Sequence, residues 1–110
     1  MIRNLLEETI ACLKENDKQE SDVLWVGRDY YDRKKNESLF YKNTWANFRK
    51  KANIMYDAGY GGNEIGLDLV VVGKDFWHER HEYDGSEWWE FKTMPTEPAE
   101  VMELDVKEHW

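Results

Sequence analysis

The four residues from His78 to His81 (HERH) combine two imidazoles with a carboxylate and are the first candidates for chemistry. The segment is one residue shorter than H-E-x-x-H, the motif in which a helix brings two histidines to one zinc ion. The surrounding residues FWHERHEY alternate in the manner of a β-strand, and on a strand positions i and i+3 point to opposite faces. The pattern therefore argues against a zinc protease site.

A metal site of another composition is compatible with the same strand. A turn at residues 74–75 would place Asp68 opposite His81 on the neighbouring strand. Zinc accepts one histidine together with carboxylates, and two further carboxylates precede Asp68 in the chain. The candidate ligands of such a zinc site, structural rather than catalytic, are Asp57, Glu64, Asp68 and His81. In the alternative interpretation, the carboxylates are loop or cap groups and His81 stacks on Trp88.

Asp75, Glu90 and Lys92 superficially match the D…E-x-K pattern that holds magnesium in many nucleases. This spacing is common by chance, and an acidic surface would repel a nucleic-acid substrate. The chain has no GK[ST] phosphate loop, no serine nucleophile elbow and a single cysteine, Cys12. We therefore expect a protein without catalytic activity, with a metal-dependent hydrolase or nuclease as the alternative.

The charge of the 110-residue chain is distributed unevenly. Residues 1–74 contain 12 acidic and 12 basic side chains, whereas residues 75–110 contain 11 acidic and 3 basic side chains, so the whole net charge of −8 belongs to the last third. This predicts no direct binding to nucleic acid, whose phosphates the carboxylates repel, and an attraction to a basic partner. The alternative is a solvated acidic surface that aids solubility.

The segment YDGSEWWEFK (83–92) places two tryptophans directly after an Asp-Gly pair, a strong signal for a two-residue type I′ hairpin. The resulting register gives each face of the hairpin both aromatic and charged side chains. Because a sheet covered on one side needs only one apolar face, one aromatic row is available to a partner. The predicted partner-binding residues are Trp77, Glu79, Glu82, Glu87, Trp88 and Glu90. In the alternative interpretation, both tryptophans belong to the core and Arg80 stacks on Trp89.

Hydrophobic periodicity predicts the elements that position these side chains. Apolar residues at three- and four-residue spacing indicate a helix from about Ile2 to Asn16, and a second helix follows Thr44, a residue typical of N-caps. Strands are predicted at 23–27, 67–72, 76–83 and 87–93, loops at 28–37 and 56–66, and a short helix after Thr96.

The expected fold class is α+β: a small, mainly antiparallel sheet, made of a C-terminal three-strand meander plus one strand from the N-terminal half, covered by two helices. Residues 1–94 form a single domain, and residues 95–110 form an acidic C-terminal extension. The sequence has neither a signal peptide nor a membrane span, and it has one cysteine. We therefore expect a cytoplasmic protein, monomer or homodimer, without a membrane partner. Self-association through the uncovered sheet face is a further alternative function.

The segments YDAGYGGNEIGLDLVVVG and FWHERHEYDGSEWWEFKTMP, within residues 56–95, resemble the C-terminal half of small acidic proteins of bacteriophages and mobile elements of Gram-positive bacteria. Some such proteins are anti-CRISPRs against type II-A Cas9. The resemblance implies a non-catalytic Cas9 inhibitor, in the cytoplasm of the bacterial host, that blocks DNA loading or cleavage. Acidic side chains would compete with nucleic acid for the positively charged channels of Cas9, with aromatic side chains as anchors.

Overall fold

Two helices begin at the cap residues that the sequence offers. In the computed structural model, which describes residues 1–59, 62 and 64–107, the side chains of Asn4 and Thr44 each accept a hydrogen bond from the backbone N–H three residues further on. They start α1 (Leu5–Glu15) and α2 (Trp45–Lys51). The Thr44 cap is thus confirmed, whereas the first helix starts later than the predicted Ile2.

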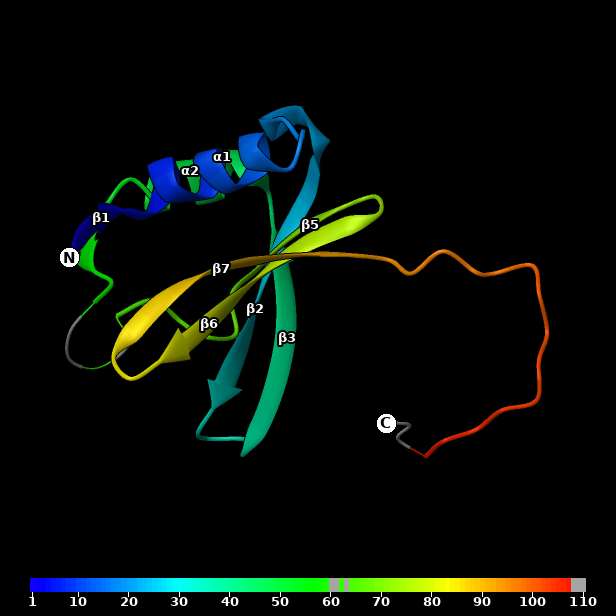
Figure 1. The fold of residues 1–110 in the computed structure, drawn as a ribbon. Coiled ribbons are helices and arrows are strands. Elements are labelled where there is room, and N and C mark those ends of the chain that lie inside the picture. The colour runs from blue at the N-terminus through cyan, green and yellow to red at the C-terminus, as the bar shows by residue number, and fades with distance from the viewer. Residues whose placement is uncertain (60–61, 63, 108–110) are drawn as a thin grey trace.

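The strands form one large and one small antiparallel sheet (Figure 1). The five-stranded sheet has the order β3-β2-β5-β6-β7, and β1 pairs with β4. The bounds are β1 Ile2–Asn4, β2 Val23–Asp32, β3 Glu37–Asn43, β4 Met55–Asp57, β5 Val70–Gly73, β6 Phe76–Tyr83 and β7 Ser86–Thr93, with a short 3₁₀ helix, η1, at Glu20–Asp22. The α+β class and the antiparallel meander β5-β6-β7 are confirmed.

The hairpin between β6 and β7 has the predicted register. Tyr83 pairs with Ser86 and His81 with Trp88, and the ladder continues to the far end of both strands. Asp84 and Gly85 both have positive φ, 50° and 84°, as a type I′ turn requires. The turn residues therefore fix which side chains share a face.

The predicted loop at residues 28–37 is wrong. Strand β2 continues to Asp32 and turns through Asn36, which has φ 52°, into β3. Only Val23 to Gly27 of β2 pair with β5, so the rest of β2 and its partner β3 project beyond the sheet. We call the projecting hairpin, residues 28–41, the arm.

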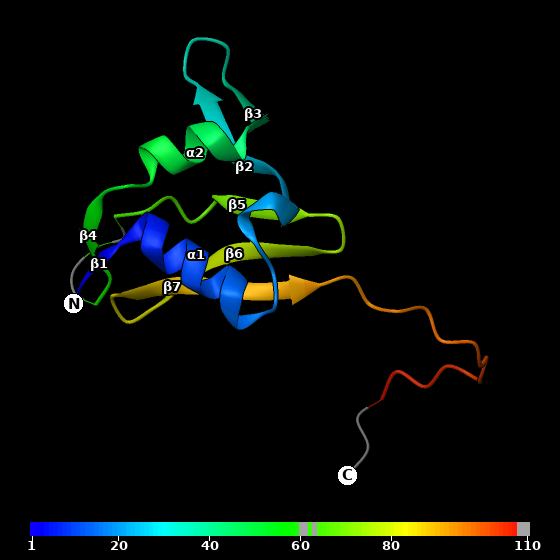
Figure 2. The same ribbon diagram turned by 90° about the horizontal axis from the view of Figure 1, so that it is seen from above.

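Three smaller predictions also need correction. The loop expected at residues 56–66 begins inside β4, which pairs with the equally unpredicted β1. Strand β5 starts at Val70 rather than at residue 67. The described tail, residues 94–107, contains no helix and extends away from the sheet (Figures 1 and 2), so the helix predicted after Thr96 is wrong.

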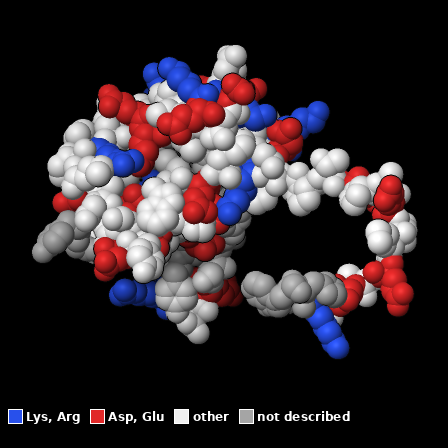
Figure 3. Space-filling model, in the orientation of Figure 1, with Lys and Arg blue, Asp and Glu red and all other residues white. Residues whose placement is uncertain are grey.

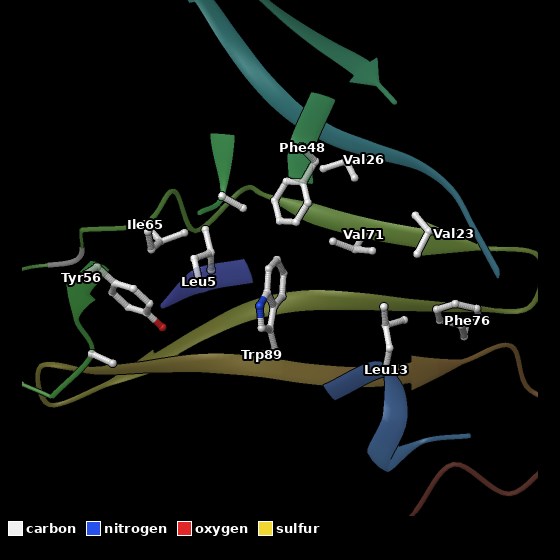
Figure 4. Close-up of a cluster of buried hydrophobic side chains, with 12 residues drawn as sticks. Leu5, Leu13, Val23, Val26, Phe48, Tyr56, Ile65, Val71, Phe76 and Trp89 are labelled. Carbon is white, nitrogen blue, oxygen red and sulfur yellow. The ribbon is translucent and has the colours of Figure 1, made fainter. Parts of the chain in front are cut away.

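Both helices lie on the same face of the large sheet (Figure 2), with α1 against β7 and α2 against β2. Burial of apolar side chains between these layers is the main stabilising term of such a fold. Figure 4 shows the core, which comprises Leu5, Leu13, Val23, Val26, Phe48, Ala52, Tyr56, Ala58, Ile65, Val71, Phe76 and Trp89. No helix in the described part of the chain is long and apolar enough to span a membrane.

Candidate functional site

The helix-covered face of the β6–β7 hairpin contains Trp89, which belongs to the core. Its Nε1–H donates to Oγ1 of Thr9 at 2.9 Å, and the guanidinium of Arg80 lies 4.8 Å from its ring centroid. The interpretation in which Arg80 stacks on Trp89 inside the core is therefore correct for this tryptophan. It does not apply to Trp77 and Trp88, which lie on the other face.

Glu87 also lies on the covered face and is buried. Its Oε1 is 3.0 Å from Nη2 of Arg80, and its carboxylate accepts hydrogen bonds from the backbone N–H groups of Glu64 and Ile65. The prediction that Glu87 contacts a partner is therefore wrong. Its cross-strand neighbour Glu82 is exposed but belongs to the same, helix-covered face of the hairpin.

The opposite face of the large sheet carries no helix in the described part of the chain, and we call it the open face. By strand alternation from the observed registers, its side chains include Trp25, Phe40, Lys42, Val70, Val72, Trp77, Glu79, His81, Trp88, Glu90 and Lys92. Trp25, Trp77 and Trp88 are each half-buried by their neighbours alone. Four of the six predicted partner-binding residues, namely Trp77, Glu79, Trp88 and Glu90, are thus brought together.

On strands β6 and β7, the charged groups of the open face contact one another and the indoles. Glu79 accepts from Nε1–H of Trp77 at 2.8 Å, and Glu90 accepts from Nε1–H of Trp88 at 3.4 Å. Nε2 of His81 lies between the two carboxylates, 3.0 Å from Glu79 and 3.2 Å from Glu90. The Trp77 hydrogen bond is the main cause that lowers the pKa of Glu79. These contacts hold the positions of two indole rings that remain partly exposed.

Two further aromatic residues of the open face were missed by sequence reasoning. The rings of Trp25 and Phe40 meet edge to face at a centroid distance of 6.0 Å. Phe40 belongs to β3, which was predicted as neither strand nor neighbour of β2, so its side chain could not be assigned to this face. The sequence offered no periodic signal for this part of β2, because Gly27 and Asp29 interrupt the apolar side chains on the face of Trp25.

The four candidate zinc ligands are not brought together. Asp57 pairs with the terminal ammonium group of Met1 at 2.9 Å, which lowers the pKa of its carboxyl, and Glu64 accepts from the backbone N–H of Asp57. Asp68 accepts from the backbone N–H of Asp29 and faces Arg28. His81 lies on the open face with its two glutamates. The described residues contain no cluster of three or more potential metal ligands.

The D…E-x-K residues are also apart. Asp75 lies in the turn between β5 and β6, where its carboxylate is 3.6 Å from Nζ of Lys18, on the helix side of the sheet. Glu90 and Lys92 contact each other on the open face at 3.3 Å. The geometry therefore does not assemble the carboxylate pair that a magnesium-dependent nuclease of this type requires.

Cys12 and His78 are neighbours in the interior, with 3.7 Å between Sγ and Nε2. Burial lowers the pKa of His78 to about 4 and raises the pKa of Cys12 to about 11. At neutral pH both groups are therefore uncharged. Because the thiolate is the reactive form of cysteine, this pair is not an activated nucleophile.

Comparisons with protein-family models, with curated proteins and with solved structures found no match to this chain. We therefore infer its function from the geometry and chemistry of its surfaces. The open face carries three half-buried tryptophans and no covering helix in the described part of the chain.

Proposed function

We propose that this chain is a non-catalytic binding protein that docks the open face onto a basic protein and thereby inhibits a nucleic-acid-handling partner. The observation that carries the proposal is that three half-buried tryptophans, Trp25, Trp77 and Trp88, lie on a sheet face without a covering helix in the described part of the chain. The resemblance of residues 56–95 to phage anti-CRISPRs makes type II-A Cas9 the first partner to test.

Tryptophan suits this role because its ring supplies a large apolar area with few rotatable bonds. Interface hot spots are enriched in Trp for this reason, and each can contribute about 2 kcal/mol or more to binding. On the open face, the hydrogen bonds to Glu79 and Glu90 fix the indoles of Trp77 and Trp88 before a partner arrives. Such pre-organisation lowers the entropy cost of association.

The attraction to a basic partner comes chiefly from the tail rather than from the open face itself. On the open face, Lys92 lies beside Glu90 and offsets its charge. The segment 96–110 has five acidic residues and one basic residue, a net charge of −4, and acidic side chains follow the extended tail in Figure 3. An exposed acidic segment raises the rate of association with a basic surface. This effect becomes smaller at high salt, because salt screens the charges.

The test is DNA cleavage by a type II-A Cas9 with its guide RNA, with and without a molar excess of this protein. Inhibition together with co-elution in gel filtration is expected. The double variant Trp77→Ala/Trp88→Ala should abolish both, whereas the matched control Tyr83→Ala, an exposed aromatic at the hairpin turn, should not. Deletion of residues 96–110 should slow association at low salt and change dissociation little.

Two outcomes would contradict the proposal. Unchanged cleavage without co-elution removes Cas9 as the partner. A dimer in light scattering that dissociates in the Trp77→Ala/Trp88→Ala variant assigns the open face to self-association instead. Circular dichroism of each variant separates lost binding from lost folding.

A further inference from the structure

The arm has an excess of positive charge, in contrast to the chain as a whole. Residues 28–51, which span the arm, the end of β3 and α2, contain eight basic and three acidic side chains, a net charge of +5. Within the described chain, Arg28 and Arg49 pair with Asp68 and Glu20. The other six basic residues are exposed and form no ion pair with a described carboxylate: Arg33, Lys34, Lys35, Lys42, Lys50 and Lys51.

The arm also exposes aromatic side chains on both of its faces. Tyr30, Tyr31 and Phe40 are each more than half exposed, at 56%, 52% and 53%, and Tyr41 is 41% exposed. A two-stranded ribbon with water on both sides is at best marginally stable, and its strands bury little of this aromatic area. Exposed rings on such a projecting ribbon are therefore better explained by a ligand than by the core.

A groove connects the base of the arm with α2, which lies beside β2 in Figure 2. The groove has a volume of about 590 Å³, and its polar lining includes Arg28, Tyr41, Asn43, Asn47, Lys50 and Lys51. Arg28 and Tyr41 are cross-strand partners, and by strand alternation the pair two steps outward, Tyr30 and Leu39, shares their face of the ribbon. The next pair outward on this face is Asp32 and Glu37, which lies between these side chains and the basic turn at residues 33–35. The cations next to the rings are therefore those of the groove, chiefly Lys50 and Lys51.

We propose that the arm and the groove beside α2 bind single-stranded nucleic acid. Lys50 and Lys51 in the groove neutralise phosphates, and the exposed rings of Tyr30 and Tyr41 provide surfaces on which unpaired bases stack. A duplex does not offer its base faces to such rings, so an unpaired strand is the occupant that uses both features. The acidic last third of the chain, which led to the expectation of no nucleic-acid binding, is separate from this surface in sequence and in net charge.

The first test is fluorescence anisotropy with labelled DNA and RNA oligonucleotides of about 12 nucleotides, a length within the range of known single-strand sites. We expect binding that weakens with salt. The double variant Lys50→Gln/Lys51→Gln should lower the affinity about 25-fold at 0.1 M salt and reduce the salt slope by about 1.4, because each phosphate contact contributes about 0.7. The matched control is Lys14→Gln/Lys74→Gln, which removes the same charge at exposed positions on α1 and in the β5–β6 turn.

The second test addresses the rings. Tyr30→Leu/Tyr41→Leu keeps apolar area on the strands but removes the aromatic surface, and it should weaken binding about tenfold or more. Tyr83→Leu, an exposed tyrosine outside the arm, should have no effect. The open-face variant Trp77→Ala/Trp88→Ala should also bind the oligonucleotide normally, so failure of the proposed function and failure of this proposal are distinguishable.

Binding to either DNA or RNA supports the proposal, and the stronger of the two identifies the sugar that the site prefers. Absence of binding by folded protein overturns it, as does binding that the arm variants leave unchanged. The proposal would also be overturned if a duplex of the same length bound as tightly as the single strand. The same holds if polyglutamate displaced the oligonucleotide as effectively as an unlabelled single strand does, because the interaction would then depend on charge alone.

Discussion

Arg80 and Glu87 form an ion pair inside the fold, with 3.0 Å between Nη2 and Oε1 and neither side chain accessible to solvent. Glu8 of α1 contacts the same guanidinium at 3.1 Å, and the hydroxyl of Tyr56 accepts from it at 3.1 Å. The pair therefore links α1, β4, β6 and β7 through one charged group. Glu87 extends the link to the segment after β4 through the N–H groups that its carboxylate accepts.

Replacing Glu87 with alanine is expected to lower the free energy of unfolding by about 3–5 kcal/mol, because it leaves a buried guanidinium short of a partner and two backbone N–H groups without an acceptor. Urea unfolding followed by circular dichroism measures the loss. Glu82→Ala, at the exposed cross-strand position, is the control and should change stability by less than about 0.5 kcal/mol. Equal effects at the two positions would mean that Glu87 is not buried with Arg80.

This pair also shows what the sequence could and could not predict. The Asp84-Gly85 turn predicted the register of β6 and β7 correctly, so Glu82 and Glu87 were placed opposite each other. Which face the helices cover depends on long-range packing, and the pattern of charges on both faces did not reveal it. A carboxylate expected at the surface was therefore the buried partner of a guanidinium.

A second prediction concerns His78, which burial keeps neutral by lowering its pKa to about 4. In the unfolded chain an ordinary histidine has a pKa of about 6.5, so the unfolded state binds more protons between these two values. Stability is therefore expected to fall as the pH decreases from about 6.5 toward 4, by about 2 kcal/mol at pH 5. Glutamates whose pKa is lowered in the fold, such as Glu79, stay ionised through most of this range.

The pH dependence is measured as the urea midpoint between pH 7.5 and 5. His78→Leu and His78→Phe, which replace the imidazole by apolar side chains next to Phe76, Trp89 and Phe91, should flatten the curve over this range. The stability of each variant at pH 7.5, compared with that of the unmodified protein, gives the packing cost of the substitution. The pH dependence of each variant is then measured relative to its own value at pH 7.5. A curve as steep as that of the unmodified protein in both variants would assign the acid sensitivity to other groups.

A third prediction follows from His81, whose Nε2 lies between Glu79 and Glu90. The two glutamates are cross-strand partners, and like charges in this position repel. His81→Ala should therefore cost about 0.5–1 kcal/mol, and the cost should shrink when Glu90→Gln has already removed the repulsion. A double-mutant cycle by urea unfolding gives the coupling energy. Additive effects would show that the histidine does not bridge the carboxylates.

The arm was not predicted because its local composition is typical of loops. Charged residues and a lysine pair occupy the turn, and the adjacent residues Tyr30 and Tyr31, flanked by Asp29 and Asp32, give no clear apolar face. A ribbon exposed on both sides needs no apolar face. The alternation of apolar and polar residues that is usual in strands is therefore lost where β2 and β3 leave the sheet. Because β3 was not predicted, Phe40 could not be assigned to the open face.

The last prediction concerns Gly27, which lies under the rings of that part of the open face. A Cβ atom at this position would be 2.6 Å from Cζ of Phe40 and 2.6 Å from Cζ3 of Trp25, too close for either ring to stay in place. Gly27→Ala should therefore separate the rings and change the near-ultraviolet circular dichroism of the protein.

The cost of separating these rings, about 1–3 kcal/mol for overpacking, is partly offset because alanine is favoured over glycine in a strand by about 0.5–1 kcal/mol. We expect a net loss of about 1 kcal/mol in urea unfolding. Gly62→Ala is the control, because no atom of the described chain lies within 4 Å of the position that its methyl group would take. A more stable Gly27→Ala protein with an unchanged aromatic spectrum would mean that Trp25 and Phe40 do not meet over this glycine, and the open face would lose the aromatic pair at its β2–β3 end.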